Sequence, residues 1–399
     1  MRSITIVGAS LAGLRAAETL RRDGFDGTIT MIGDEPHRPY DRPPLSKQIL
    51  AGSWEPDRAP LASDESFDDL NVEWRLGTRA TGLDMASATV ALDDGSSVTH
   101  DGLIIATGAR CRTIRGTEDL DGVHTLRTLD DCLAIRADFE ASPGRVVVVG
   151  AGFIGAEVAA TAKELGLDVT MVEMAPVPFE PILGARMGQV CADVQRDHAV
   201  DLRTGVGVEA IEGGDRVERV VLTDGTVLDA DVVVVGVGVV PNTEWLEGSG
   251  LTLDNGVVCD ETCLAAPGVV AAGDVARWPN RRFDEVMRVE HWDNAVEQGV
   301  HAARRLLSGG DDPYTPVPWF WSDQFDRKIQ LAGRTRPDDD VEIVTGSIEE
   351  RRFAAAYGRN GKLVGILGFN RPRHVMQYRG LMNDGASWDD AMAFARDSA

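Results

Sequence analysis

Two glycine-rich segments in this sequence contain the residues that hold the pyrophosphate of a dinucleotide. Residues 8–13 read Gly-Ala-Ser-Leu-Ala-Gly after an apolar stretch at 3–7, and residues 150–155 read Gly-Ala-Gly-Phe-Ile-Gly after an apolar stretch at 145–149. In a strand–turn–helix unit, one glycine permits the tight turn, one lets the phosphates approach the backbone and one packs the helix on the strand. The N–H groups at the start of the helix then attract the phosphates. The sequence therefore predicts two dinucleotide sites.

The two segments differ at their middle position, which is Ser10 in the first and Gly152 in the second. A side chain here stands where the backbone comes nearest to the phosphates. The serine hydroxyl is small and can donate a hydrogen bond. We therefore expect the first segment to retain dinucleotide binding.

An acidic residue follows the second predicted strand of each half. Asp34 and Glu35 follow a strand predicted at 28–32, and Glu173 follows one at 168–172. A carboxylate about 20 residues into such a unit accepts hydrogen bonds from the adenosine ribose. A solvated charge in a turn is the alternative interpretation.

Glu173 also bears on the choice between NADH and NADPH. A carboxylate at this position accepts a hydrogen bond from the 2′-hydroxyl and repels a 2′-phosphate. The next residues, Met174 and Ala175, supply no guanidinium that would bind that phosphate. The second site is therefore predicted to bind NADH.

The elements that must position these residues repeat along the chain. An Asp-Gly pair at 94–95 and another at 224–225 stand between alternating apolar residues, which predicts a hairpin in each half. Each hairpin leads to a buried strand that ends in glycine, at Gly108 and at Gly238, with the same spacing from the turn. The agreement indicates a duplicated domain and not merely a duplicated motif.

The remainder of the chain does not repeat. Gly273 and Asp274 end a short apolar strand, a helix is predicted at 294–307, and the aromatic run 319–324 precedes strand-like sequence. The predicted fold is α/β, with two Rossmann-type three-layer nucleotide-binding domains and a C-terminal α+β domain. The predicted boundaries are 1–112 with 244–318 for the first nucleotide domain, 113–243 for the second and 319–399 for the C-terminal domain.

Composition narrows the possible partners and location. The chain has 399 residues, 43% hydrophobic content and a net charge of −24, which disfavours nucleic acid and anionic membranes as partners. The apolar run at 232–240 contains two glycines and is too short to span a membrane, and no signal-peptide pattern is visible, so a cytoplasmic protein is expected. The five cysteines lack metal-site spacing, so we expect free thiols and no metal site.

Several motifs together resemble a known family. Residues 42–47 read Arg-Pro-Pro-Leu-Ser-Lys, 106–108 Ala-Thr-Gly, 126–128 Leu-Arg-Thr and 319–324 Trp-Phe-Trp-Ser-Asp-Gln, in order with both glycine segments and Gly-Asp at 273–274. Over nearly the whole chain this resembles the oxygenase-coupled NADH-dependent ferredoxin reductases, which have the glutathione-reductase-like flavoprotein fold. The resemblance implies FAD in the first domain, NADH in the second and a two-iron ferredoxin as electron acceptor.

The resemblance also implies which residues contact the two cofactors. For FAD, these are Gly8, Ser10, Ala12, Gly13, Asp34 or Glu35, Arg42, Pro43, Lys47, Ala80, Arg127, Gly273, Asp274 and Trp292. For NADH, they are Gly150, Gly152, Phe153, Ile154, Gly155, Glu173 and Gly238.

The resemblance implies that Lys47, Glu157 and Trp321 act at the flavin. It also implies that Phe153 shields the flavin in the absence of nicotinamide. Lys47 would lie beside flavin N5 and pair with Glu157 to balance charge during reduction, although an exposed surface ion pair is the alternative. Trp321 would cover the ring edge that faces the incoming iron–sulfur protein. Phe153 would shield the flavin until nicotinamide displaces it, and helix packing is the alternative for this residue.

The electron acceptor is inferred partly from missing cysteines. Disulfide reductases and related NADH oxidases carry reactive cysteine after the first domain's second strand, and residues 34–65 contain none. One-electron transfer to a separate carrier therefore remains, and the resemblance implies that this carrier is a ferredoxin. A monodehydroascorbate- or oxidase-like reductase and a non-catalytic flavin-binding platform are the alternatives.

An acidic ferredoxin needs a local basic surface on a chain of this charge. The candidate residues are Arg304, Arg305, Arg371, Arg373 and Arg379, for each of which an ordinary solvated role is the alternative. Both a monomer and a homodimer are compatible with the resemblance.

Overall fold

The computed structural model describes residues 1–141 and 143–397, and these divide into two compact units. Unit 1 comprises Met1–Asp41, Ala59–Arg110 and Val240–Pro318, and unit 2 comprises Arg42–Arg58, Cys111–Val239 and Trp319–Ala399. Unit 2 therefore contains both the second glycine segment and the C-terminal region. The segment 42–58, which the predicted boundaries assign to the first nucleotide domain, clusters with unit 2.

Unit 1 is built on a six-stranded sheet in the order β19-β20-β7-β1-β2-β3. All neighbouring pairs are parallel except β19 with β20. Its strands are β1 (Ser3–Val7), β2 (Thr28–Ile32), β3 (Val72–Arg75), β7 (Gly102–Ile105), β19 (Leu264–Ala266) and β20 (Val269–Ala271). β1 and β7 are nearly continuous runs of buried residues, as expected for parallel strands covered on both faces.

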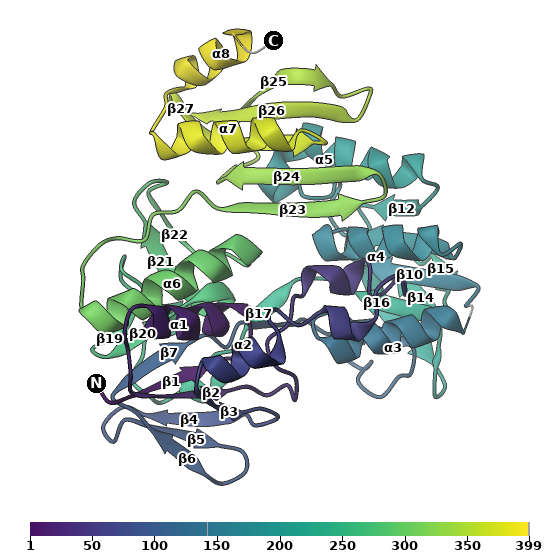
Figure 1. Cartoon of the computed structure of the whole chain (residues 1–399). Coiled ribbons are helices and arrows are strands. Elements are labelled where there is room, and N and C mark those ends of the chain that lie inside the picture. Colours follow the sequence, from purple (N-terminus) through teal and green to yellow (C-terminus); the bar gives the residue numbers. More distant parts are fainter. Residues whose placement is uncertain (142, 398–399) are drawn as a thin grey trace. The chain divides into compact units, whose positions relative to one another are not determined.

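Helices α1 (Leu11–Arg22) and α6 (Trp292–Ser308) pack against each other in unit 1 (Figure 1). Gly299 makes this packing possible, because a Cβ atom there would lie 2.5 Å from the carbonyl oxygen of Ala12. This contact holds the first turn of α1 against the middle of α6. The smaller elements of unit 1 are α2 (Asp64–Asp69), β18 (Val257–Val258), β21 (Ala276–Asn280) and β22 (Glu285–Met287).

Each unit carries the three-stranded ribbon that the Asp-Gly pairs predict. The ribbon of unit 1 consists of β4 (Ala80–Asp84), β5 (Thr89–Leu92) and β6 (Ser97–Thr99), and that of unit 2 of β13 (Val208–Gly213), β14 (Val217–Leu222) and β15 (Val227–Asp229). Gly95 and Gly225 have φ of 82° and 84°, which a glycine adopts without strain. Both predicted hairpins are confirmed.

The second parallel sheet, in unit 2, has the order β12-β11-β10-β16-β9. Its strands are β9 (Val123–Thr125), β10 (Arg145–Val149), β11 (Asp168–Glu173), β12 (Asp201–Thr204) and β16 (Val232–Val235), and the helices of this region are α3 (Leu129–Glu140), α4 (Phe153–Glu164) and α5 (Glu180–Asp197). The central strands are rich in valine, whose branched side chain suits a buried strand. The chain passes between the units within β8 (Ala109–Cys111) and β17 (Val239–Pro241).

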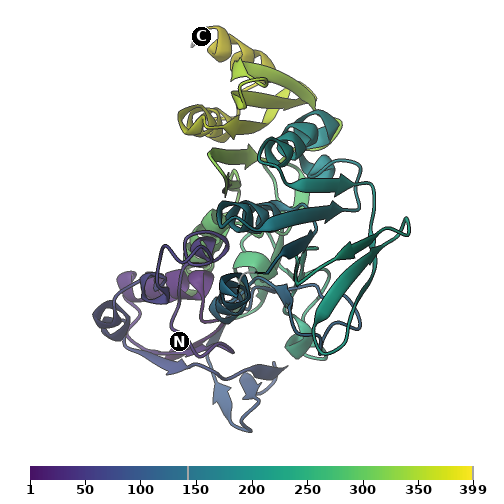
Figure 2. The ribbon, with the colours of Figure 1, turned by 90° about the vertical axis from the view of Figure 1, so that its right-hand side faces the viewer.

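The C-terminal region is an antiparallel sheet with two helices, as the α+β prediction requires. The strand order is β23-β24-β27-β26-β25, with β23 (Trp319–Gln324), β24 (Arg327–Gly333), β25 (Asp340–Ser347), β26 (Arg352–Arg359) and β27 (Lys362–Phe369). Figures 1 and 2 show α7 (Pro372–Asn383) and α8 (Trp388–Asp397), in yellow, beside these strands. The sheet shares an apolar core with α5, through residues such as Leu183, Met187 and Phe353.

No helix in the described part of the chain combines the length and the apolar character needed to cross a membrane.

Candidate functional site

The predicted FAD residues of unit 1 lie at one edge of its parallel sheet. Gly8 follows β1, Asp34 follows β2 by two residues, and Gly273 follows β20 by two residues. These strands run parallel, so their carboxyl ends meet at the same edge. β1 lies between β2 and β7, which makes this edge the switch point where α/β sheets bind ligands.

The first and last glycines of the loop in unit 1 have no room for a side chain. A Cβ atom on Gly8, whose φ is 125°, would lie 2.0 Å from the carbonyl oxygen of Ala106, and one on Gly13 would lie 2.0 Å from that of Gly8. A Cβ on Gly273 would lie 3.1 Å from the Cβ of Ala12. Close packing of the backbone therefore requires glycine at the first and last positions of this loop.

Ser10 begins the helix that follows the loop. It is the N-cap of α1, and its side chain makes no capping hydrogen bond. No side chain at this N-cap therefore competes for the first N–H groups of α1, and these groups fit the negative charge of a pyrophosphate.

The structure distinguishes the two acidic candidates of unit 1. Asp34 has 57% of its side chain exposed and forms a loose ion pair with Arg79, 3.8 Å between the nearest atoms. Glu35 is half-buried and accepts a short hydrogen bond from the Tyr40 hydroxyl. Of the two carboxylates, Glu35 is therefore the one held in a protected position.

Two other predicted FAD residues of unit 1 begin structural elements. Trp292 is the first residue of α6, and its indole Nε1 donates to the carboxylate of Asp41 over 2.7 Å. The sequence analysis did not identify Asp41, which stands just before the Arg-Pro-Pro motif. Ala80 is the buried first residue of β4, in the ribbon and not in the parallel sheet. The Asp274 carbonyl accepts from Arg288 over 2.9 Å.

The glycine loop of unit 2 has the same closely packed outer glycines, but its middle residue is also a glycine. A Cβ on Gly150, with φ of 97°, would lie 2.4 Å from the carbonyl oxygen of Gly236, and one on Gly155 would lie 2.1 Å from that of Gly150. Gly152 caps α4, and a Cβ there would approach nothing closer than Gly236 O at 3.9 Å. The space in front of Gly152 is therefore open, as a bound phosphate requires.

The remaining predicted NADH residues of unit 2 border this loop. Ile154 lies in the first turn of α4 with 48% of its surface exposed. Gly238 has φ of 91°, and nothing lies within 4 Å of where its Cβ would be.

Glu173 is fixed by the backbone on both of its oxygens. Oε2 accepts from the Ala151 N–H over 2.8 Å, and Oε1 accepts from the Ala175 N–H over 2.8 Å. Each carboxylate oxygen has a second lone pair, so the group can still accept hydrogen bonds from a ribose. Met174, beside it, is 78% exposed.

Lys47 and Glu157 form a buried ion pair in unit 2. The ammonium Nζ lies 2.7 Å from Glu157 Oε2, and the two side chains are 14% and 4% exposed. Lys47 follows the 3₁₀ turn η1 (Pro43–Ser46), which begins with two prolines and packs near α4. The burial contradicts the alternative that this is an exposed surface pair.

The Glu157 carboxylate accepts three further hydrogen bonds. Ser46 Oγ donates to Oε2 over 2.5 Å, and Oε1 accepts from Ser322 Oγ over 2.9 Å and from the Asp323 N–H over 3.0 Å. The sequence analysis identified neither serine. Ser46 stands beside Lys47 in sequence, but nothing in the sequence connects Ser322 with Glu157.

The arginines predicted near the flavin also lie in unit 2. Arg42 Nη1 donates to the carbonyl oxygen of Arg127 over 2.5 Å. The Arg127 N–H donates to the Asp131 carboxylate over 2.9 Å, next to the capping box that Thr128 and Asp131 form at the start of α3. Pro43 is the first residue of η1. The structure thus brings the Arg42 and Arg127 segments together.

Phe153 belongs to a cluster of three aromatic rings. Its ring stacks on Phe179, with centroids 4.1 Å apart and planes inclined by 24°, and meets the Phe320 ring edge-on at 4.5 Å. Phe179 has φ of 60°, an uncommon conformation for a bulky residue. Phe153 is half-buried at the first position of α4.

Trp321 points to the opposite face of β23 from Ser322, because side chains alternate along a strand. Its ring stacks on that of Trp319, with centroids 5.2 Å apart. On the other face, Ser322 and Gln324 are fully buried. β23 therefore carries Trp319 and Trp321 on one face, and Phe320, Ser322 and Gln324 on the face that contacts α4.

The cysteines are poorly suited to thiol chemistry. All five are free, and four of them are buried. Burial raises the pKa of the Cys132, Cys191 and Cys259 thiols to about 12 and raises that of Cys263 further. Since the thiolate is the reactive form, these side chains serve as small apolar groups.

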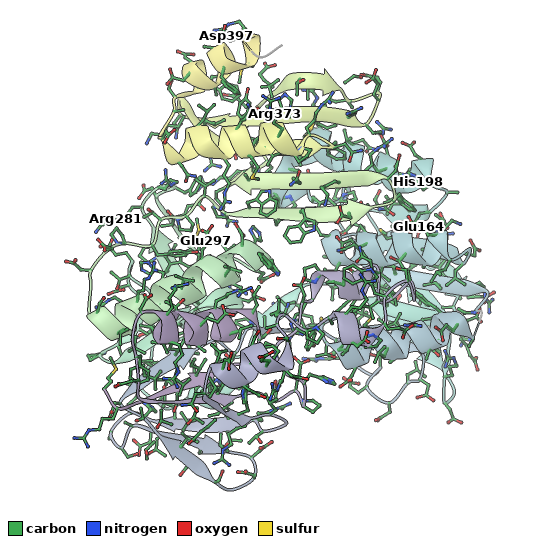
Figure 3. The ribbon with its side chains drawn as sticks, in the orientation of Figure 1. Glu164, His198, Arg281, Glu297, Arg373 and Asp397 are labelled. Atoms are coloured by element: carbon green, nitrogen blue, oxygen red, sulfur yellow. The ribbon has the colours of Figure 1, made fainter. Side chains whose placement is uncertain are left out.

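The candidate docking arginines divide into two groups. Arg304 is paired with Asp23 at 2.9 Å, and Arg305 donates to the Thr262 hydroxyl over 2.8 Å. Arg373 is exposed on α7, where Figure 3 labels it. Burial, together with the positive charges of Arg371 and Arg373, lowers the pKa of His374. α7 thus carries a local positive charge.

Comparison with known proteins gives matches over nearly the whole chain. The family described as pyridine nucleotide-disulphide oxidoreductase matches residues 2–299, and the reductase C-terminal family matches 319–398. Rhodocoxin reductase of Rhodococcus erythropolis is 40% identical, over 95% of this chain and 89% of its own length. The ferredoxin–NAD(+) reductase component of the anthranilate 1,2-dioxygenase system of Burkholderia cepacia is 36% identical, over 96% and 95%.

Among solved structures, the reductase in the covalent putidaredoxin reductase–putidaredoxin complex superposes with a TM-score of 0.92. It is 32% identical in sequence, and the match covers 96% of this chain and 93% of that one.

Proposed function

Because this chain belongs to the ferredoxin reductases of oxygenase systems within the pyridine nucleotide-disulphide oxidoreductase family, we propose that it transfers electrons from NADH to a ferredoxin. FAD, when bound, accepts a two-electron hydride and releases single electrons, which is the conversion that a one-electron carrier needs. A ferredoxin so reduced would supply a monooxygenase or dioxygenase.

The observation that carries this proposal is the pair of glycine loops at the switch points of two parallel sheets. Both loops put closely packed glycines and a helix N-terminus at the carboxyl ends of the strands. In the proposal, residues 1–112 with 244–318 bind FAD, residues 113–243 bind NADH and residues 319–399 form the C-terminal domain. The strongest support for two nucleotides is that each loop has its own carboxylate.

In unit 1, the FAD pyrophosphate lies against Gly8, Ser10, Ala12 and Gly13, where the α1 N–H groups and the Ser10 hydroxyl donate to it. Glu35 holds the adenosine ribose, since its carboxylate is the more protected of the two candidates. Gly273, Asp274 and Trp292 border the same edge of the sheet, and the hydrogen bond to Asp41 fixes the orientation of the Trp292 indole. Ala80 stays a predicted contact.

In unit 2, NADH binds the loop from Gly150 to Gly155, and the fixed carboxylate of Glu173 accepts from the 2′-hydroxyl. The two backbone hydrogen bonds keep the carboxylate in place before the coenzyme arrives. A 2′-phosphate would meet this negative charge with no arginine among the next two residues. The chain is therefore specific for NADH.

Lys47 acts at the reacting end of the site, and Glu157 holds its ammonium in place. A buried cation beside a group that gains negative charge stabilises the reduced state. Trp321 covers the site on the side of the protein partner, and Phe153 leaves its aromatic cluster when nicotinamide enters. Arg42, Pro43 and Arg127 complete the predicted flavin contacts.

The partner is a two-iron ferredoxin with an acidic surface, which docks on the exposed side of α7. Arg373 is exposed there beside Met376, which is 40% exposed, and so offers both charge and apolar contact. The protein works in the cytoplasm as a monomer or homodimer, without membrane or nucleic acid. Of the alternatives, an acceptor that needs a reactive thiol is disfavoured by the raised cysteine pKa values.

One experiment separates this proposal from its alternatives. The purified flavoprotein is mixed anaerobically with NADH, and cytochrome c reduction is then followed with a panel of two-iron ferredoxins. We expect rapid bleaching of the flavin by NADH and cytochrome c turnover only when a ferredoxin is present. Bleaching with equal turnover in the absence of any ferredoxin would indicate a reductase of another acceptor, and no bleaching would indicate a binding platform.

A further inference from the structure

Glu157 lies at the end of an ordered chain of hydrogen bonds that begins in α5 and passes through β23. Gln195 Nε2 donates to Gln324 Oε1 over 2.9 Å, Gln324 Nε2 donates to Ser322 Oγ over 3.1 Å, and Ser322 Oγ donates to Glu157 Oε1 over 2.9 Å. All four residues are buried, with at most 3% of the surface of each whole residue exposed.

The direction of this chain is determined by chemistry. A hydroxyl has one hydrogen to donate and lone pairs to accept. Since Gln324 offers an N–H to Ser322 Oγ, the Ser322 hydrogen is free to point at the carboxylate. The Gln324 amide is oriented in turn, because its oxygen accepts from Gln195. Ser322 is therefore held as a donor to Glu157.

The donors around the carboxylate are divided evenly between its two oxygens. Oε2 accepts from Lys47 and Ser46, and Oε1 accepts from Ser322 and the Asp323 N–H. The two donors on Oε1 fix the orientation of the carboxylate, so that Oε2 faces the Lys47 ammonium.

We propose that Ser322, oriented by Gln324 and Gln195, is a positioning residue that holds the Glu157 carboxylate directed at Lys47. By this means a side chain of the C-terminal region contributes to the geometry of the charged pair. The consequence for hydride transfer rests on the proposed function, whereas the effect on Glu157 itself does not.

The first test reads Glu157 directly in the apoprotein. With ¹³C-labelled glutamate, infrared spectroscopy detects the carboxylate stretching bands, whose frequency depends on the hydrogen bonds that the oxygens accept, and Glu157→Gln identifies the part of the band that belongs to this residue. We expect the Glu157 band to shift in frequency in Ser322→Ala, because a hydrogen bond to a charged group is lost. Ser322→Thr, which keeps the hydroxyl, should restore the wild-type band.

A matched control removes a buried hydroxyl elsewhere in the C-terminal region. Thr335 is buried, and its hydroxyl donates to the Ile182 carbonyl oxygen over 2.6 Å and not to a carboxylate. Thr335→Val should lower the melting temperature without moving the Glu157 band. An unchanged band in Ser322→Ala, or an equal movement in Thr335→Val, would overturn the proposal.

The second test measures the rate of flavin reduction by NADH. The rate should fall about tenfold in Ser322→Ala, because a carboxylate that has lost one hydrogen bond holds Lys47 less firmly; it should return in Ser322→Thr and keep the wild-type value in Thr335→Val. Movement of the infrared band with no change in this rate would overturn the link to hydride transfer. A wild-type protein whose flavin NADH does not bleach would overturn the proposed function instead, and the infrared result would stand by itself.

Discussion

The glycine loops after β1 and β10 meet the same backbone constraint but present different groups to a ligand. In both loops the first and last glycines pack against carbonyl oxygens at distances of 2.0–2.4 Å from a hypothetical Cβ. The middle position is Ser10 in unit 1 and Gly152, with open space before it, in unit 2. The outer glycines are thus required by the protein itself, and the middle residue is limited only by the ligand.

The acidic residues differ as well. Glu173 is held by two backbone N–H groups, one of them within its own glycine loop, whereas Glu35 is held by the Tyr40 side chain. A carboxylate bound to its loop by the backbone has a fixed position in the free protein. In the proposed function, the fold sets where each dinucleotide lies, and we expect the backbone-bound carboxylate of Glu173 to select NADH over NADPH.

The largest expected effect on cofactor binding comes from placing a side chain at the first glycine of each loop in turn. Gly8→Val should lower FAD affinity by at least about a hundredfold, because about 1–3 kcal/mol of backbone strain adds to a clash with Ala106. Gly150→Val should leave the flavin bound and abolish saturable NADH binding. Flavin absorbance per protein and stopped-flow reduction measure the two effects, and thermal unfolding checks that each variant folds. Loss of flavin from both variants alike would contradict the division of roles.

A substitution in the buried Lys47–Glu157 pair tests whether the two glycine loops alone account for the rate at which NADH reduces the flavin. Lys47→Ala should slow flavin reduction by NADH on the order of a hundredfold, as when one electrostatic contact to a reacting group is removed, and should leave most of the FAD bound. Lys362→Ala, at an exposed lysine on β27, is the control and should change neither. A Lys47→Ala variant that reduces its flavin at the wild-type rate would remove Lys47 from the mechanism.

Coenzyme choice tests the difference between the two carboxylates. Glu173→Ala combined with Met174→Arg should shift the ratio of kcat/KM for NADPH over NADH by about ten- to a hundredfold, since a hydrogen bond to a charged group contributes about 1.5–3 kcal/mol. Glu35→Ala should weaken FAD binding and leave this ratio unchanged. Unchanged selectivity in the Glu173 variant would count against the role of that carboxylate.

Docking on α7 is expected to depend on salt. Arg373→Glu should raise the KM for ferredoxin several-fold at low ionic strength, and the difference should diminish as salt screens the exposed charge. NADH-to-ferricyanide activity should stay the same, because it needs no protein partner. Arg304→Glu is the matched control, since Arg304 is already paired with Asp23. Equal salt dependence of both activities would argue against an electrostatic dock.

The smallest effect on cofactor binding is expected from exchanging the middle residues. Ser10→Gly should weaken FAD binding by about tenfold, the lower end of the range for one hydrogen bond to a charged group, and Gly152→Ser should alter NADH affinity within the same range. Isothermal titration of apoprotein with FAD and kinetic titration with NADH give the two values. A complete loss of NADH binding in Gly152→Ser would show that the open space before α4 is fully used by the phosphates.

Local patterns in the sequence predicted much of this fold. The apolar strands before each glycine loop and the two Asp-Gly hairpins depend on neighbouring residues, so they could be read directly and are confirmed. The family resemblance and the FAD and NADH expectation rest on ordered motifs, and the comparisons bear them out.

The interactions that complete the site could not be predicted in this way. Ser322 and Glu157 are separated by 165 positions, and their contact depends on how β23 packs on α4. Alternation along β23 indicates that Ser322 faces away from Trp321, but not which residue it meets. The stacking of Phe153 on Phe179 likewise depends on a left-handed backbone conformation at Phe179, which no local signal indicates.

The short excursion of the chain from Arg42 to Arg58 has a consequence for protein engineering. These residues cluster with unit 2, although both flanking segments belong to unit 1. Recombination between related reductases at only the 110 and 240 boundaries would therefore join a foreign α4 to the parental Lys47. A hybrid that exchanges residues 42–58 together with the rest of unit 2 would keep each lysine with the glutamate alongside which it evolved.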